Sequence, residues 1–295
     1  MIRFLPLICL FTFSQAFAQD YFEQFRTALQ AQDTVAQMKA LKDWEAAKPN
    51  DPELFTSYFN YYFYNSRQTG IAIENHPEGE ESLSIQDSVG TRWYMNDGVW
   101  FNRKKLDKGF EFIDKGIALY PDRLDMRFGK AFVYREMKDW NAFTNELIAT
   151  IEYGKTIDFQ WIWTKNQSLE DGVNFFMTSM QDYMMQLYFS KHDSTSVYMR
   201  AISAKILEVF PEDVKFLSNM AISYMLEEDY KSGLPYLLHA EQVDPSDFII
   251  MNNIATAYKE LKETDKAIEY YQKLEKSGDE RAQEYARKEL EELQK

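Results

Sequence analysis

The stretch that decides the fold is NMAISY at 219–224, which recurs as NIATAY at 253–258, 34 residues further along the chain. In both copies an alanine stands three positions before a tyrosine, and in the segment that follows each copy Gly233 corresponds to Ala267. Small residues at these places let two antiparallel helices approach closely, while the aromatic ring fills the space between them. A repeat of this length predicts helix pairs that stack into an array.

These residues resemble the tetratricopeptide repeat, which also places a proline after its second helix, as at Pro211 and Pro245. The resemblance implies an all-α fold, a right-handed α-solenoid of tetratricopeptide-type helix pairs. It is clearest over 212–276, and weaker copies upstream extend the expected helical-repeat domain over 19–295. A last helix at 279–293 has apolar residues on one side only, which is typical of a terminal cap.

One segment departs from the helical pattern by alternating apolar and polar residues. GIAIE at 70–74 and SLSIQ at 82–86 show this period of two on either side of a Pro/Gly turn. The pattern predicts a small β-hairpin inserted over 66–90, with a disordered loop as the alternative. We expect the chain to return to helix near 91–103.

A second departure is the aromatic loop at 154–170, which contains FQWIW at 159–163. Long loops in compact arrays are uncommon and often functional. Trp161 and Trp163 therefore allow two interpretations. They form a platform that binds a partner, or they fold back and cover a gap in the core.

The N-terminus has the features of a bacterial signal peptide over 1–18. Arg3 precedes an apolar stretch, and a small-x-small site predicts cleavage after Ala18. The apolar stretch is too short to cross a bilayer, which takes about 20 residues. The single cysteine, Cys9, lies inside this segment, so the mature chain has no disulfide. We expect an exported protein that is periplasmic or secreted.

The charge balance narrows the class of partner. The formal net charge is −14, from 47 acidic and 33 basic residues. Nucleic-acid binding depends on Lys and Arg that neutralise phosphates, and anionic lipid attracts the same residues. We therefore expect a protein or peptide partner, no nucleic acid, and no membrane insertion after signal cleavage.

No constellation of residues in the sequence predicts catalysis. The three histidines, His76, His192 and His239, are far apart, and the mature chain has no cysteine. There is no Gly-rich phosphate loop and no serine nucleophile elbow. We predict no catalytic residue, no metal and no cofactor.

In the tetratricopeptide family the first helix of each pair lines a concave groove that receives an extended peptide. The resemblance places five polar residues of this chain in that groove. An Asn amide donates and accepts at once, which suits a peptide backbone. The candidate partner-binding residues are Lys215, Asn219, Asn253, Thr256 and Lys259, together with Trp161 and Trp163 of the aromatic loop.

The main hypothesis is therefore an exported scaffold or adaptor that binds a protein or extended peptide. One alternative is a carbohydrate-binding accessory protein that stacks sugars on Trp93, Trp100, Trp161 and Trp163. A further alternative is a metal-dependent hydrolase centred on the acidic turn that contains His76.

Overall fold

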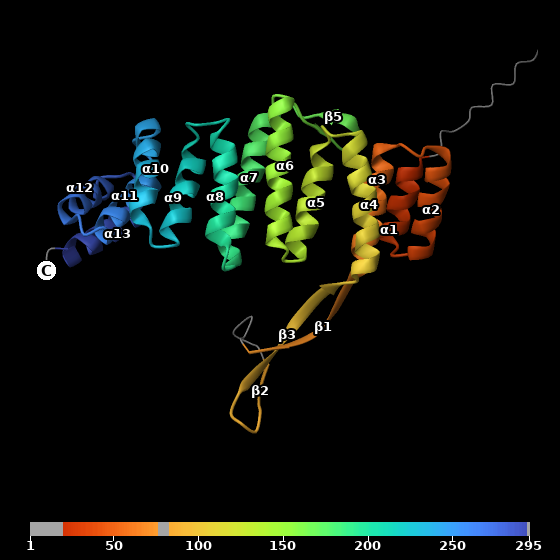
Figure 1. Ribbon diagram of the computed structural model, residues 1–295, viewed down its shortest axis with the longest axis horizontal. Coiled ribbons are helices and arrows are strands. Elements are labelled where there is room, and N and C mark those ends of the chain that lie inside the picture. Colours follow the sequence, from red (N-terminus) through yellow and green to blue (C-terminus); the bar gives the residue numbers. More distant parts are fainter. Residues whose placement is uncertain (1–19, 76–82, 294–295) are drawn as a thin grey trace, which may run out of the picture.

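The computed structural model describes residues 20–75 and 83–293, so the predicted signal peptide at 1–18 lies outside the described residues. Within the described part, thirteen α-helices form a row (Figure 1). This row is the α-solenoid that the repeat predicts. The helices are α1 (Tyr21–Gln30), α2 (Thr34–Ala47), α3 (Pro52–Ser66), α4 (Arg103–Leu119), α5 (Leu124–Glu136), α6 (Trp140–Thr156), α7 (Gly172–Ser190), α8 (Thr195–Leu207), α9 (Val214–Met225), α10 (Tyr230–Val243), α11 (Phe248–Glu260), α12 (Thr264–Glu275) and α13 (Glu280–Leu293).

Acidic and amide side chains set where most helices begin. Ten helices follow an Asp or Asn whose side-chain oxygen accepts a hydrogen bond from a backbone N–H of the first turn. Such a cap satisfies a donor that would otherwise lack a partner. The acidic composition of the chain thus contributes directly to its helix boundaries.

A common tight turn joins the two helices of four pairs. Its central residue has a positive φ, at Gln32, Lys138, Glu228 and Lys262. The backbone N–H of the next residue donates to the carbonyl five positions earlier, as Asp139 does to Tyr134 at 2.9 Å. This left-handed residue ends the first helix and reverses the chain, so that the second helix runs antiparallel to the first.

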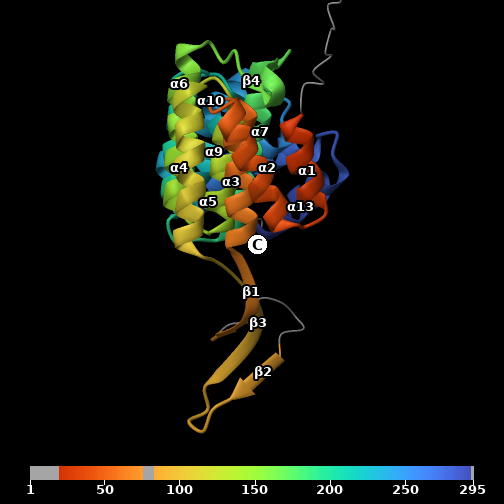
Figure 2. The ribbon, with the colours of Figure 1, turned by 90° about the vertical axis from the view of Figure 1, so that its right-hand side faces the viewer.

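In the second pair a β-sheet takes the place of the tight turn. Strands β1 (Arg67–Glu74) and β3 (Arg92–Phe101) run antiparallel from the end of α3 to the start of α4, and β2 (Leu83–Gln86) completes the order β1-β3-β2. The backbone N–H of Asn102 donates to the carbonyl of Ser66 at 2.8 Å and closes the root. We call this sheet the β-arm, because it projects away from the row of helices (Figures 1 and 2).

The β-arm corrects two expectations. The predicted strands near 70–74 and 82–86 do not pair with each other, since each pairs with β3. The turn predicted between them lies largely outside the described residues. The helix predicted near 91–103 is wrong, because most of this segment is β3. Its aromatic and β-branched residues favour a strand, and the decisive pairing with β1 is non-local.

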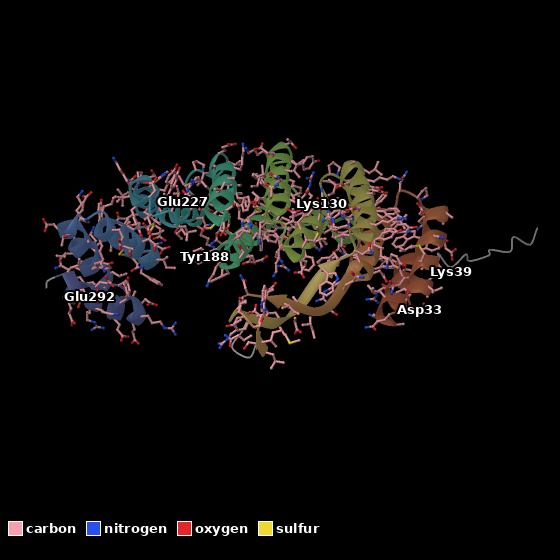
Figure 3. The ribbon with its side chains drawn as sticks, turned by 60° about the horizontal axis from the view of Figure 1, so that its bottom comes forward. Asp33, Lys39, Lys130, Tyr188, Glu227 and Glu292 are labelled. Carbon is pink, nitrogen blue, oxygen red and sulfur yellow. The ribbon has the colours of Figure 1, made fainter. Side chains whose placement is uncertain are left out.

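The core runs along the array as a chain of apolar clusters. Charged contacts link the layers, and Lys130 of α5 is the clearest case (Figure 3). Its Nζ lies 2.8 Å from Asp114 of α4 and 2.8 Å from Glu146 of α6. Burial alone lowers the pKa of Lys130, but the two carboxylates outweigh it and raise that pKa above its ordinary value.

Candidate functional site

A cavity of about 310 Å³ lies where the first helices of the first three pairs meet the aromatic loop. We call it the N-terminal pocket. It opens between α1, α3 and α5, and the loop forms one wall. Its lining includes aromatic, polar and charged side chains: Phe22, Phe25, Arg26, Leu29, Glu53, Thr56, Ser57, Phe59, Asn60, Ile113, Asp125, Gly129, Trp163 and Thr164.

The apolar walls of the N-terminal pocket are held by aromatic contacts. Phe22 packs edge-on against Trp44, with 6.3 Å between ring centroids. Trp163 packs edge-on against Phe175 at 5.2 Å and stays partly exposed. Because neighbouring rings fix both side chains, they present rigid apolar surface at little entropic cost.

A buried charge cluster forms the other wall. Arg123 is fully buried, and its guanidinium donates to both oxygens of Asp125 at 2.7 Å and lies 2.9 Å from Glu53. Burial by itself lowers the pKa of Arg123, but its bonds to Asp125 and Glu53 raise the net value. A buried guanidinium is tolerated when such partners satisfy it.

The same cluster holds the aromatic loop on the helices. The backbone N–H of Lys165 donates to Glu53 at 2.6 Å, and Arg123 donates to Asn166 at 3.1 Å. The loop contains β4 (Ile162–Trp163), a short 3-10 turn at Thr164–Asn166, and β5 (Gln167–Ser168). A segment that leaves α6 therefore reaches back to α3 and gives the pocket its wall.

Gly129 leaves the floor of the N-terminal pocket open. It lies inside α5, and a Cβ placed there would meet no atom within 4 Å. It stands two positions before Ala131, as Asn219 stands before Ala221 in its own repeat. A glycine inside a helix costs about 1 kcal/mol relative to alanine, and no packing contact here requires it.

The two tryptophans of the aromatic loop have different environments. Trp161 is 1% exposed and stacks on Phe176 with 6.0 Å between centroids. It therefore fills the core, which is the second of the two interpretations, and it offers no platform. Trp163 lines the N-terminal pocket and is the one of the two that a ligand can reach. Sequence alone treats the pair alike, because both belong to one short aromatic run.

The five predicted groove residues do not form one open surface. Asn219 is 6% exposed, and its amide donates to Gln181 of α7 at 2.7 Å, so it links two helix pairs. Lys259 forms an ion pair with Glu289 of α13. Lys215 is exposed at the start of α9, while Asn253 and Thr256 are half-buried on α11. Partner binding by these residues stays a prediction.

The sequence reasoning did not find the N-terminal pocket. Glu53, Arg123 and Gly129 come from the upstream repeats, whose pattern is weak. One signal was present: Arg123 occupies the N-cap position that Asp occupies before α3, α9 and α11. An arginine cannot accept a hydrogen bond there, which marks this repeat as different.

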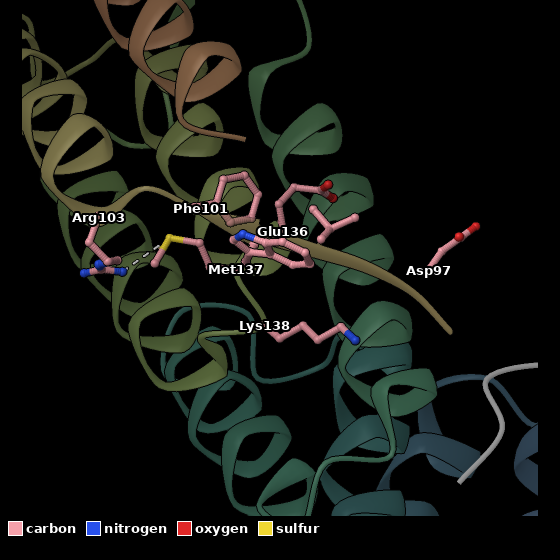
Figure 4. A pocket seen from close by; sticks show the side chains of 8 residues that line it. Asp97, Phe101, Arg103, Glu136, Met137 and Lys138 are labelled. Carbon is pink, nitrogen blue, oxygen red and sulfur yellow. Dashed lines mark hydrogen bonds between the residues drawn. The ribbon is translucent and has the colours of Figure 1, made fainter. Parts of the chain in front are cut away.

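A second cavity, of about 430 Å³, lies at the root of the β-arm (Figure 4). Trp100 and Phe101 of β3 face the turn between α5 and α6, where Arg103 donates to the sulfur of Met137 at 3.7 Å. Trp93 and Trp100 lie on opposite faces of the β-arm, because their positions differ in parity along β3. The four tryptophans proposed for sugar stacking therefore form no single platform.

Three further features bear on the class of protein. His192 accepts from the backbone N–H of Ser194 at 3.1 Å, His239 is half-buried, and His76 lies outside the described residues. No group of three or more potential metal-ligating side chains occurs in 20–75 and 83–293. None of the helices in these ranges has both the length and the apolar character needed to span a bilayer.

Residues 249–277 match a sequence model of the tetratricopeptide repeat. No curated protein matches the chain by sequence. Among solved structures, the chain is similar to the tetratricopeptide domain of P58(IPK), with 12% identity and a TM-score of 0.31 over 93% of this chain. The alignment spans 63% of that chain, which is less than two thirds of its length.

Two further similar structures belong to repeat proteins that the alignment covers more fully. One is PilW, a widely conserved type IV pilus biogenesis factor, with 12% identity, a TM-score of 0.38 and coverage of 90% of this chain and 96% of that chain. The other is a tetratricopeptide repeat protein from Parabacteroides merdae, with 12% identity, a TM-score of 0.37 and coverage of 93% and 85%.

Proposed function

We propose that this tetratricopeptide-repeat protein is an exported scaffold that holds an extended segment of a partner protein in the N-terminal pocket. Repeat arrays of this kind generally serve protein–protein interaction, and the pocket lies among the first helices of three successive pairs. The proposal replaces the groove residues expected on α9 and α11 with residues of α1, α3, α5 and the aromatic loop.

The observation that carries the proposal is the open floor at Gly129 beside rigid aromatic walls. The cavity of about 310 Å³ falls in the size range of small ligand sites and is large enough for one bulky side chain. Phe22 and Trp163 supply apolar contact, while Thr56 and Asn60 supply donors and acceptors for a peptide backbone. The best partner segment therefore presents a large apolar side chain from an extended backbone.

Export is part of the proposal and rests on the sequence of residues 1–18. Mass spectrometry of the protein recovered outside the cytoplasm of a bacterial host tests it. The expected N-terminus is Gln19, generated by cleavage after Ala18. Recovery of the uncleaved chain from the cytoplasm would contradict this part of the proposal and leave the pocket unaffected.

The pocket is tested with Gly129→Leu, because a Cβ at Gly129 meets no atom within 4 Å and a longer side chain there extends into the cavity that Gly129 lines. The matched control is Gly278→Leu, which also meets no atom within 4 Å but lies outside the pocket. Peptides are selected from a random displayed library on the mature chain, and their affinities are measured by fluorescence anisotropy.

Binding should fall at least tenfold in Gly129→Leu and stay within twofold in Gly278→Leu. A second variant, Trp163→Ala, should also weaken binding, because it removes one wall. If the selected peptides bind all three variants as they bind the parent chain, the N-terminal pocket is not the partner site.

A further inference from the structure

The β-arm has one apolar face and one polar face. In an antiparallel sheet, residues that pair directly point to the same side. Ile73 of β1 and Leu83 of β2 both pair with Met95 of β3, and Ile85 pairs with Trp93. Ile71 and Val99 belong to the same side by their position along the strands. Seven apolar side chains thus share one face: Ile71, Ile73, Leu83, Ile85, Trp93, Met95 and Val99.

The opposite face carries most of the polar side chains of the strands, together with Tyr94 and Trp100. Gln68, Glu74, Ser84 and Asn96 lie there, and Asn96 donates to Glu74 at 3.0 Å. A Cβ at Gly70 or at its partner Gly98 would come within 2.7 Å of the ring of Trp100. These paired glycines therefore let the indole lie flat over the strands on this side.

The apolar face is left exposed by the rest of the described chain. Ile71 is 65% exposed and Leu83 is 72% exposed. The sheet projects from the row of helices in both views (Figures 1 and 2). A small sheet without a packed face is marginal in water, and an exposed apolar patch of a few hundred Å² usually marks an interface. The β-arm therefore needs a covering partner.

We propose that a second copy of this chain covers the apolar face, with two β-arms packed face to face around a two-fold axis. Two sheets that each have one apolar side commonly pack in this way, and a two-fold axis gives every exposed side chain a matching surface on the partner. On this face of the described strands, Asp97, which pairs with Ile71, is the only charged residue beyond Arg67 at the root, so most of the face can be buried without burying charge.

Charge favours an antiparallel arrangement of the two arms. The root of the β-arm is basic, because the pairing of Arg67 with Phe101 brings this arginine to the start of α4, which holds Arg103, Lys104 and Lys105. At the far end, the Asp87 carboxylate accepts from the indole N–H of Trp93 on the apolar face, whereas Arg92 lies on the opposite face. With the arms antiparallel, the far end of each copy lies beside the basic root of the other.

Contact through the β-arms also suits two chains whose solenoids are strongly acidic. Each chain carries a formal charge of −14, so direct packing of two solenoids is electrostatically unfavourable. The ten residues of β3 span roughly 33 Å at the usual rise for a strand. This length separates the two solenoids by several times the Debye length, which is about 8 Å at physiological salt. The electrostatic repulsion between the solenoids is therefore largely screened.

The experiment measures self-association of the mature chain by analytical ultracentrifugation between 1 and 100 µM (concentrations on the order of common interface affinities). The parent chain should form dimers in this range. Ile73→Ser/Leu83→Ser should raise the dissociation constant at least about 100-fold, because it removes four apolar side chains from the dimer interface. The control, Gln68→Ser/Ser84→Ala, changes the polar face of the same strands and should leave the constant within threefold.

Chemical cross-linking provides a second test in case the β-arm does not fold in Ile73→Ser/Leu83→Ser. Residues 20–295 contain no cysteine, so single introduced thiols report cleanly. Ile71→Cys should be joined between copies by a short bismaleimide, whereas Gln68→Cys on the opposite face should not. Cross-linking that is equal at both positions would overturn the face-to-face arrangement.

Three other results would also overturn the proposal. They are a monomer at 100 µM, a dimer that survives in Ile73→Ser/Leu83→Ser, and a monomer whose β-arm binds phosphatidylcholine vesicles. The last result would assign the apolar face to a lipid surface. Peptide binding at the N-terminal pocket is measured separately, so failure of one proposal leaves the other standing.

Discussion

Arg123 and Glu53 belong to different helix pairs, yet the guanidinium of one lies 2.9 Å from the carboxylate of the other, with Arg123 fully buried. The aromatic loop completes this contact through the backbone N–H of Lys165. One buried charge thus connects the start of α3, the start of α5 and a loop that leaves α6. The wall of the N-terminal pocket depends on it.

Arg123→Met is expected to lower the free energy of unfolding by about 3–5 kcal/mol, because it leaves two carboxylates buried without their cation. The measurement is urea unfolding followed by helical circular dichroism. Arg103→Met is the control, since Arg103 is exposed and its pair with Asp107 is 3.6 Å long. Its expected cost is below about 1 kcal/mol. Equal costs would show that the buried cluster has no special role in stability.

Gly129→Ala is expected to stabilise the protein by about 0.5–1 kcal/mol, because α5 gains a better helix former and no atom lies within 4 Å of the new methyl group. Gly116→Ala in α4 should do the opposite. Its Cβ would lie 2.9 Å from Phe55 and 3.0 Å from Met126, and overpacking typically costs about 1–3 kcal/mol. Thermal unfolding of both variants checks the sign, and a stabilising Gly116→Ala would contradict the packing described here.

Trp161→Ala should destabilise the protein by about 3–5 kcal/mol, because this ring is buried in the core between Phe176 and Tyr153. Trp163→Ala should cost only roughly 1 kcal/mol, since this ring is partly exposed. Denaturation curves of the two variants give the comparison. The reverse order of stabilities would mean that the loop places the two rings the other way round.

A four-residue network between α6 and α8 should make stability sensitive to acid. The pKa of Glu152 is lowered first by Lys205, and that of Glu208 first by Lys155. Because these values are lower in the folded chain than in the unfolded chain, their contribution is present at neutral pH. It is lost as the pH falls below the ordinary glutamate value of 4.5 and through the folded values.

Lys205→Met tests this network. The free energy of unfolding of the variant should be lower than that of the parent chain at pH 7. This difference in free energy should shrink as the pH falls below 4.5 and the glutamates become protonated. High salt should shrink it as well, because these side chains are largely solvent-accessible. Lys39→Met is the control, since its pair with Asp43 lies within one helix. A difference that stays constant with pH would argue against the network.

The tight turns show how much local sequence determines. At Lys138, Glu228 and Lys262 the left-handed residue stands directly before an acidic residue that begins the next helix. Neighbouring residues therefore determine where one helix ends and where the next helix begins. For this reason the local sequence predicts paired helices wherever the chain stays helical.

The sequence by itself determined the solenoid, because periodicity, caps and close-packing small residues act within one repeat or between adjacent repeats. The tertiary structure alone decided that β3 pairs with both β1 and β2, and that Asn219 bonds to Gln181. It also decided that Arg123 draws the aromatic loop back to Glu53, which buries Trp161 in the core and leaves Trp163 in the pocket wall. These contacts join residues far apart in the chain, and their energy depends on burial and partner geometry that no local pattern records.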